Sequence, residues 1–111
     1  MKIDIFRKKV VPEVKIALVG KFPDNLDVKI GLSRDGGYFA EIRNLPGCIT
    51  QAQNGKELFE MVNDAVYTYL DVPTEYVPFV PTFFPSEEIR KAFDIKIPEK
   101  YLKEELKFAR N

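Results

Sequence analysis

The stretch LDVKIGLSRDGGYFAEIRNLPGCITQAQNGKELFEMVNDAVYTYLDV, residues 26–72, decides the fold of this chain. Its first eight residues alternate apolar and polar side chains, and a period of two is typical of a half-buried strand. Arg34–Gly37 then supplies turn residues that tolerate positive φ, and residues 38–43 read as the second strand of a hairpin. After a break at 44–47, residues 48–52 form a third short strand. The pattern predicts three antiparallel strands in one meander.

A long amphipathic helix is predicted directly after these strands. Asn54 is a suitable N-cap, and Glu57 three residues later makes a variant of the capping box. Apolar residues then recur at three- and four-residue spacing, until Pro73 disfavours helix at the residue before it. The helix is expected over 54–71, with a polar face that holds one lysine against four carboxylates. Those carboxylates are Glu57, Glu60, Asp64 and Asp71.

The segment PTEYVPFVPTFFP, residues 73–85, holds four of the eight prolines of the chain. Proline cannot donate to a sheet ladder, so this arm is predicted to be an edge strand or an extended segment. So many apolar side chains must be buried, either on the domain itself or on a partner. The aromatic residues of the arm are Tyr76, Phe79, Phe83 and Phe84.

Shorter elements are predicted at both ends of the chain. Residues 2–6 alternate like a strand, and residues 14–19 read as a second one. After the arm, a short helical turn at 86–93 precedes a brief strand at 94–97, and a final helix opens at Pro98. The whole pattern predicts a single α+β domain in which one long helix packs on a three- to four-stranded antiparallel sheet.

The composition excludes several classes of function. A length of 111 residues fits one compact domain, and 17 basic residues balance 17 acidic ones, which argues against a broad basic surface for nucleic acid. The absence of histidine removes the commonest general base and the nucleophile pairs that depend on it. The lone Cys48 excludes an internal disulfide and a cysteine-rich zinc site. Enzymes that use only carboxylates and a metal remain possible on composition alone, and for the whole sequence we expect no enzymatic activity, no metal and no cofactor.

The location of the protein is predicted from the same sequence. No stretch approaches the roughly 20 apolar residues that span a bilayer. The opening residues lack the apolar core of a secretory signal, and a single cysteine fits a reducing compartment. We therefore expect the protein in the cytoplasm.

Residues 35–72 resemble the HicB-like antitoxin family, whose pattern is a glycine-tyrosine strand, an L-P-G-C turn and an acidic amphipathic helix. Together with the first strand, the resemblance covers residues 26–72, and it leaves 1–25 and 73–111 as extensions. Two positions depart from the pattern: Ala52 stands where many members have glycine, and Asn54 stands where serine or threonine is usual. The motif residues that match are Gly37, Tyr38, Leu45, Pro46, Gly47 and Cys48.

The resemblance implies a partly degraded ribonuclease-H-like fold that acts as a non-catalytic protein-binding module. In the family, this module neutralises a small basic toxin of the HicA type that cleaves RNA. Many members also carry a C-terminal DNA-binding segment that represses their own operon. On this interpretation a partner contacts the acidic helix face and the aromatic arm, and the chain forms a dimer or a larger homo-oligomer. The expected contact residues are Glu57, Glu60, Asp64, Asp71, Tyr76, Phe79 and Phe83.

Other interpretations stay open at this stage. The acidic face is also what a solvated helix presents, and the arm could serve a stand-alone module that associates with itself. Residues 89–111 carry seven basic side chains against four acidic ones, which leaves a DNA-binding repressor as a minor alternative. A relict metal-dependent nuclease would need converging carboxylates. The carboxylates available for it are Asp27, Asp35, Glu41, Glu60 and Asp64.

Overall fold

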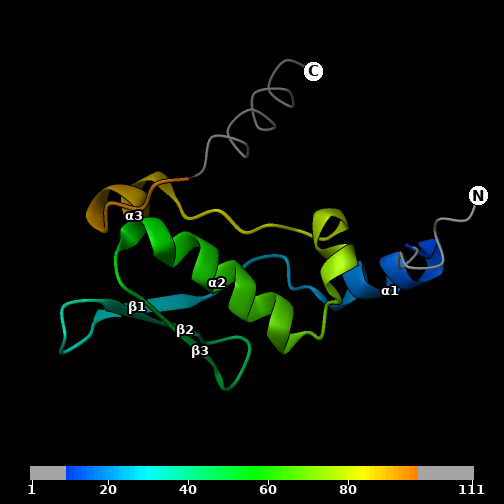
Figure 1. Ribbon diagram of the computed structural model, residues 1–111, viewed down its shortest axis with the longest axis horizontal. Helices are drawn as coiled ribbons and strands as arrows, with labels where there is room; N and C mark the ends of the chain where they lie inside the picture. Colours follow the sequence, from blue (N-terminus) through cyan, green and yellow to red (C-terminus); the bar gives the residue numbers. More distant parts are fainter. Residues whose placement is uncertain (1–9, 98–111) are drawn as a thin grey trace, which may run out of the picture.

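The fold is α+β, with a three-stranded antiparallel sheet that carries a long helix on one face (Figure 1). A computed structural model describes residues 10–97, so the predicted strand at 2–6 and the final helix from Pro98 lie outside the described residues. The sheet order is β1-β2-β3, which confirms the predicted meander. The elements are α1 (Pro12–Lys21), β1 (Val28–Leu32), β2 (Tyr38–Ile42), β3 (Cys48–Ala52), α2 (Gly55–Tyr69), the 3-10 helix η2 (Thr74–Phe79) and α3 (Glu87–Ala92).

The loop between β1 and β2 is built from short-range hydrogen bonds. The Ser33 amide donates to the Gly37 carbonyl at 2.8 Å, and the Gly36 amide donates back to the Ser33 carbonyl at 3.1 Å. Gly36 adopts a φ of 95°, which favours glycine. The Asp35 carboxylate accepts from the Ser33 hydroxyl and from the Gly37 amide, and these bonds lower the pKa of Asp35. Asp35 is therefore a loop-forming residue.

The L-P-G-C motif forms the tight turn between β2 and β3. The Cys48 amide donates to the Leu45 carbonyl at 2.9 Å, and Gly47 has a φ of 86°. A type II turn requires a positive φ at its third position, which favours glycine, and proline is common at its second. The break predicted at 44–47 is therefore a turn that redirects the chain between β2 and β3.

The core lies between α2 and the covered face of the sheet. Ile42, Leu58 and Val66 are almost completely inaccessible to solvent, and Ala40 is completely buried beneath the helix. At the start of α2, the Asn54 side chain accepts from the Glu57 amide at 2.9 Å. The Glu57 carboxylate in turn accepts from the Gln53 amide, at 2.9 Å. The predicted N-cap and its capping-box glutamate are therefore confirmed.

The long helix ends two residues earlier than predicted. Asp71 has a φ of 55°, in the left-handed region, and so it lies beyond the helix. The Val72 amide donates to the Tyr67 carbonyl and the Asp71 amide to the Thr68 carbonyl, which is the hydrogen-bond pattern of a Schellman motif. Backbone hydrogen bonds within a few residues therefore end the helix just before Pro73.

The prediction of a strand at 14–19 is wrong, because these residues belong to α1. Pro12 stands at the first helical position and Glu13 lies in the first turn, and both favour a helix start. The one buried residue of α1 is Leu18, which packs with Tyr67 and other residues beyond the end of the sheet. Of the apolar run, Leu18 is buried in this satellite cluster, whereas Val14, Ile16 and Val19 are exposed.

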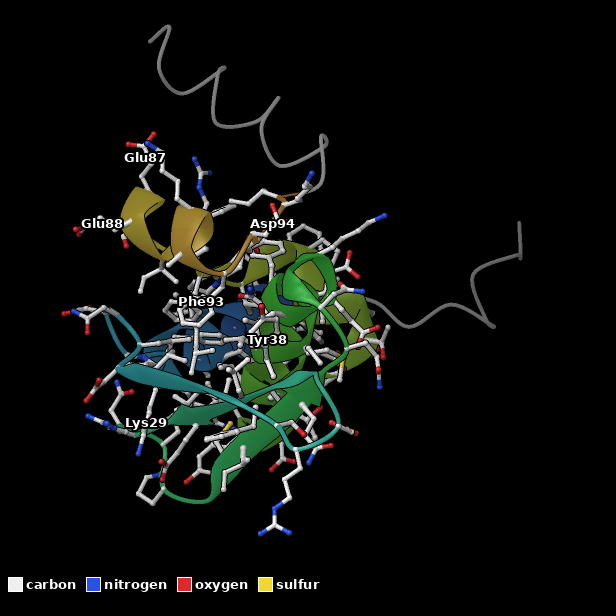
Figure 2. All side chains as sticks on the ribbon, turned by 90° about the vertical axis from the view of Figure 1, so that its left-hand side faces the viewer. Lys29, Tyr38, Glu87, Glu88, Phe93 and Asp94 are labelled. Carbon is white, nitrogen blue, oxygen red and sulfur yellow. The ribbon has the colours of Figure 1, made fainter. Side chains whose placement is uncertain are left out.

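The prediction of a strand at 94–97 is also wrong. Asp94 ends α3 with a φ of 52°, and the Ile95 amide donates to the Arg90 carbonyl. The chain then turns inward, so that Ile95 is buried in the main core. Beside it, Phe93 packs edge-on against Tyr38, with ring centroids 5.7 Å apart (Figure 2). The short helical turn predicted just before this point is confirmed as α3.

The arm at 73–85 forms no edge strand. Its first half is η2, and its second half runs extended along α2 to the start of α3 (Figure 1). The domain also lacks any spanning element: within residues 10–97 no helix is long and apolar enough to cross a membrane.

We expect Gly55→Ala to destabilise the protein by about 1–3 kcal/mol, because a Cβ at Gly55 would overlap the backbone carbonyls of Phe93 and Asp94. The matched control is Gly20→Ala in α1, where a Cβ meets nothing within 4 Å. That control should gain about 0.5–1 kcal/mol from the higher helix propensity of alanine. Urea unfolding of the two variants measures the difference. Equal midpoints would contradict the close packing at Gly55.

We expect Asp35→Asn to reduce the acid sensitivity of the fold. The folded pKa of Asp35 lies below its ordinary value of 3.8. The stabilisation from its carboxylate is therefore present above the unfolded pKa and is lost as the pH falls through the folded one. Urea midpoints at pH 7 and pH 3 should lie closer together in the variant than in the parent protein. An unchanged gap would contradict the role of this carboxylate.

Candidate protein-binding surface

The outer face of α2 carries a stripe of carboxylates, here called the acidic stripe: Glu57, Glu60 and Asp64. At about 100° per residue, these positions fall within roughly 60° of arc on the side away from the sheet. The side facing the sheet is formed by Leu58 and Val66, which are buried in the core. Glu60 and Asp64 are exposed, and Glu57 is half-buried by its capping role.

The electrostatic character of this face comes from the lack of balancing charge. Lys56 is the only basic residue of α2, and the last turn of the helix has none. Asp71 follows beyond the C-cap, where it is exposed but no longer on the helical stripe. The structure therefore brings Glu57, Glu60 and Asp64 together and leaves Asp71 apart.

A side-chain clamp holds the arm against the flank of α2 next to the acidic stripe. Asn63 is buried, at 6% exposure, and its amide oxygen accepts from the Phe83 amide at 2.7 Å. Its amide nitrogen donates to the Phe83 carbonyl at 3.0 Å and also to the Phe59 carbonyl. One turn further on, the Tyr67 hydroxyl donates to the Pro81 carbonyl at 3.0 Å. The clamp pairs both backbone groups of Phe83 without any strand.

Sequence reasoning missed this clamp. The available signal was a polar Asn63 on the apolar side of the helical pattern, directly between Phe59 and Tyr67. A side-chain amide in that position must find partners when it is buried. The partner could not be foreseen, because it lies 20 residues further along the chain.

The aromatic residues of the arm have different environments. Tyr76 is a core residue with 5% exposure, and its hydroxyl accepts from the Val11 amide at 2.9 Å, so it is no surface contact. Phe83 is half-buried and stacks on Phe22, with centroids 6.1 Å apart. Phe79 is 48% exposed beneath the Lys15 ammonium, which lies 5.4 Å from the ring centroid. Of the three predicted contact residues in the arm, only Phe79 remains largely open.

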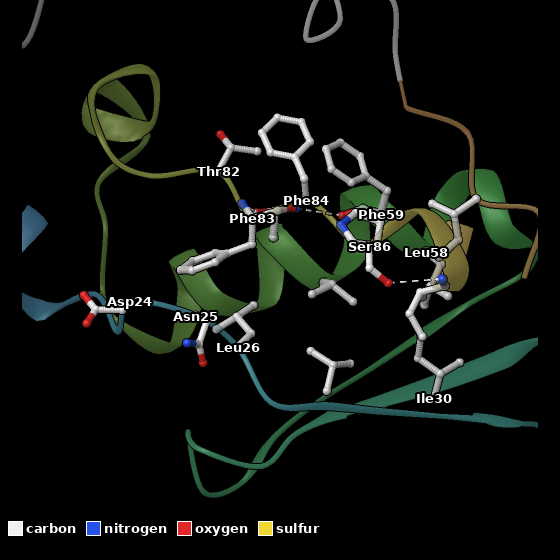
Figure 3. A pocket seen from close by; sticks show the side chains of 16 residues that line it. Asp24, Asn25, Leu26, Ile30, Leu58, Phe59, Thr82, Phe83, Phe84 and Ser86 are labelled. Carbon is white, nitrogen blue, oxygen red and sulfur yellow. Dashed lines mark hydrogen bonds between the residues drawn. The ribbon is translucent and has the colours of Figure 1, made fainter. Parts of the chain in front are cut away.

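A groove of about 580 Å³ lies between β1, α2 and the arm (Figure 3). The β1 strand runs along its lower side, α2 forms the back, and the arm passes above. The polar side chains that line it are Asp24, Asn25, Asn63, Thr82 and Ser86. The apolar side chains that line it include Leu26, Val28, Ile30, Phe83, Phe84 and Ile89.

The carboxylates considered for a relict nuclease do not gather into a metal site. Within residues 10–97, no group of three or more histidine, cysteine or acidic side chains is placed to hold a metal ion. Asp35 belongs to the β1–β2 loop, whereas Glu41 and Asp27 are exposed elsewhere on the sheet and its approach. This part of the chain therefore offers no two-metal centre of the kind that reaction needs.

Cys48 is a packing residue. It is 4% exposed, and its thiol donates to the Ala65 carbonyl at 3.6 Å. Burial raises the pKa of the Cys48 thiol, which keeps it protonated and unreactive. Cys48 therefore serves as a small buried apolar residue.

Fold and surface together define a small α+β domain that presents an acidic helix. Comparison with known proteins finds similarity to a UPF0150 protein of Archaeoglobus fulgidus, with 42% identity over 45 residues. This alignment covers 40% of the present chain and 65% of that protein, so the chain spans less than two thirds of the length of the relative. No family model and no solved structure matches the chain.

We expect Asn63→Leu to release the arm and to lower the free energy of unfolding by about 2–4 kcal/mol, because it removes the partners of both Phe83 backbone groups. The matched control is Asn44→Ala, which also removes two side-chain bonds to backbone, but at an exposed site. Water can replace those bonds, so the control should cost about 1 kcal/mol or less. Urea unfolding gives the energies, and hydrogen exchange at the Phe83 amide reports arm release. An equally slow exchange in both variants would contradict the clamp.

Proposed function

We propose that this chain is a non-catalytic protein-binding module of the HicB-like antitoxin kind, which neutralises a small basic RNA-cleaving toxin. The observation that carries the proposal is the acidic stripe, whose Glu60 and Asp64 stand exposed on the outer face of α2 in a chain of zero net charge. A toxin that binds RNA must present cationic side chains to phosphate. The acidic stripe offers those side chains a competing anionic surface.

The rigidity of α2 supports this role. The helix is capped at its start by Asn54 and closed at its end by a Schellman motif, and its inner face is buried in the core. Glu60 and Asp64 lie one turn apart on this fixed support, so little backbone entropy is lost when a partner binds. Complementary charge then raises the association rate and sets the register of the complex.

The resemblance to the HicB-like family adds to this argument. It rests on the hairpin, the turn at Leu45–Cys48 and the capped helix, and these elements follow one another in this fold in the order of the family pattern. The similarity to the UPF0150 protein concerns a stretch of 45 residues and brings no activity with it. The toxin partner is therefore proposed from the charge of α2 together with the resemblance.

The test is a pull-down with the tagged full chain from its native host. We expect a small basic protein at equal stoichiometry, which is released as the salt concentration is raised. Salt screens the attraction between exposed charges, and the Debye length, about 8 Å at physiological salt, becomes shorter as salt is added. The captured protein should cleave RNA once it is freed and should stop when the chain is added back. The double variant Glu60→Lys, Asp64→Lys should weaken capture at least about tenfold.

The matched control is Glu13→Lys, Glu41→Lys, which makes the same change in charge at exposed positions of α1 and β2. It should keep the affinity of the parent chain within about threefold, since these positions lie off the acidic stripe. Recovery of the bait alone would refute the proposal. An equal loss in the control would also refute it, because net charge and not the acidic stripe would then govern binding.

A further inference from the structure

The β1 strand has a free edge within the described part of the chain. It pairs on one side with β2, in a register that sets Lys29 opposite Glu41 and Gly31 opposite Phe39. The hydrogen bonds at the two ends of this pairing involve Asp27 and Ser33, so the odd-numbered residues bond to β2. The alternation of an antiparallel ladder therefore turns the backbone groups of the intervening residues outward. These residues are Val28, Ile30 and Leu32.

The groove described above lies directly beside this edge. The side chains of Val28 and Ile30 line it, and the arm residues Phe83 and Phe84 close it from above (Figure 3). A row of unpaired peptide groups next to an apolar groove is the arrangement that accepts an added strand. Backbone bonds supply affinity in such a complex, and alternate side chains of the added strand enter the groove.

The exposure of Leu32 indicates which strand is added at this edge. It shares the covered side of the sheet with Val28 and Ile30, yet it is 73% exposed. If β1 of a second copy pairs antiparallel with β1 about Ile30, then Leu32 of the second copy lies opposite Val28. It thereby enters the groove end formed by Leu26 and Phe83. The same symmetry buries the first Leu32 in the groove of the second copy, so the interface is isologous.

The charges fit this register. Pairing about Ile30 sets Lys29 opposite Gly31 of the second copy, so the two lysines do not face each other, which would be unfavourable. Beyond the strand, Arg34 of the second copy lies opposite Leu26. There it meets the exposed carboxylates of Asp24 and Asp27. By symmetry the same complementary contact occurs at both ends of the interface.

We propose that two copies of this chain pair through β1 about a twofold axis at Ile30, so that two three-stranded sheets join and Leu32 of each copy fills the groove of the other. The acidic stripe lies on the outer face of α2 and stays open in this dimer. The dimer therefore does not depend on the proposed toxin. Its failure and the failure of the antitoxin proposal are separate outcomes.

The first experiment measures the mass of the full chain in solution across a concentration series. The parent protein should be a dimer, and Leu32→Glu should raise its dissociation constant at least about tenfold, because it places a charge in an apolar groove. Leu32 is exposed in the single chain, so the variant should fold normally. The matched control is Ile49→Glu, at a similarly exposed residue of β3 with 60% exposure, and it should remain a dimer. The variant Glu60→Lys, Asp64→Lys should also remain a dimer.

The second experiment tests the register by cross-linking. Ile30 and its symmetry mate form a hydrogen-bonded pair, whose Cβ atoms lie about 5.5 Å apart and therefore too far apart for a direct disulfide. In Ile30→Cys the two thiols should instead be joined by a short bifunctional thiol reagent, whereas those of Ile49→Cys should not. The native Cys48 is buried and should not interfere.

Three results would overturn the proposal. The first is a monomeric parent protein, including one in which a terminal segment of the same chain covers β1 and protects the Ile30 amide from exchange. The second is a dimer that survives Leu32→Glu. The third is a dimer without a cross-link at position 30, because the strands would then pair in another register or through another surface.

Discussion

Hydrogen bonds from the Asn63 and Tyr67 side chains to the backbone of Phe83 and Pro81 hold the arm to α2, and the position of the arm on the domain depends on them. They fix an extended, proline-rich segment that cannot pair as a strand. Once fixed, Phe83 stacks on Phe22, and this contact links the satellite cluster under α1 to the core. The same segment closes the top of the groove beside β1. One buried amide therefore joins the N-terminal helix, the arm and the sheet.

Three sides of helix α2 make different contacts. One side buries Leu58 and Val66 against the sheet, and the next holds the arm through Asn63. The remaining side carries Glu60 and Asp64 to solvent. Because the sheet and the arm cover two adjacent sides, the three carboxylates of the helix, Glu57, Glu60 and Asp64, collect on the third. The anionic surface is a consequence of this packing even though the whole chain is neutral.

Much of the candidate surface could be predicted from the sequence, and the remainder could not. The position of Glu60 and Asp64 on a common face follows from helical periodicity alone. Tyr76 and Phe79 look equivalent in the sequence, since each is an aromatic residue between prolines. Only the fold separates them: Tyr76 accepts the Val11 amide inside a cluster, and Phe79 stays on the surface. The groove could not be predicted from the sequence, because the residues that line it come from segments far apart in the chain.

The sequence by itself determined several of the elements whose interactions are short in range. The alternating strands, the turn at Leu45–Cys48 and the cap at Asn54 need only neighbours a few residues away, so their patterns were sufficient. Tertiary structure decided the remaining elements. Residues 14–19 read as a strand but form a helix that buries Leu18 in a satellite cluster, and Ile95 turns inward after α3 and packs in the main core. Such choices depend on the free energy of burial against distant partners, which no local pattern records.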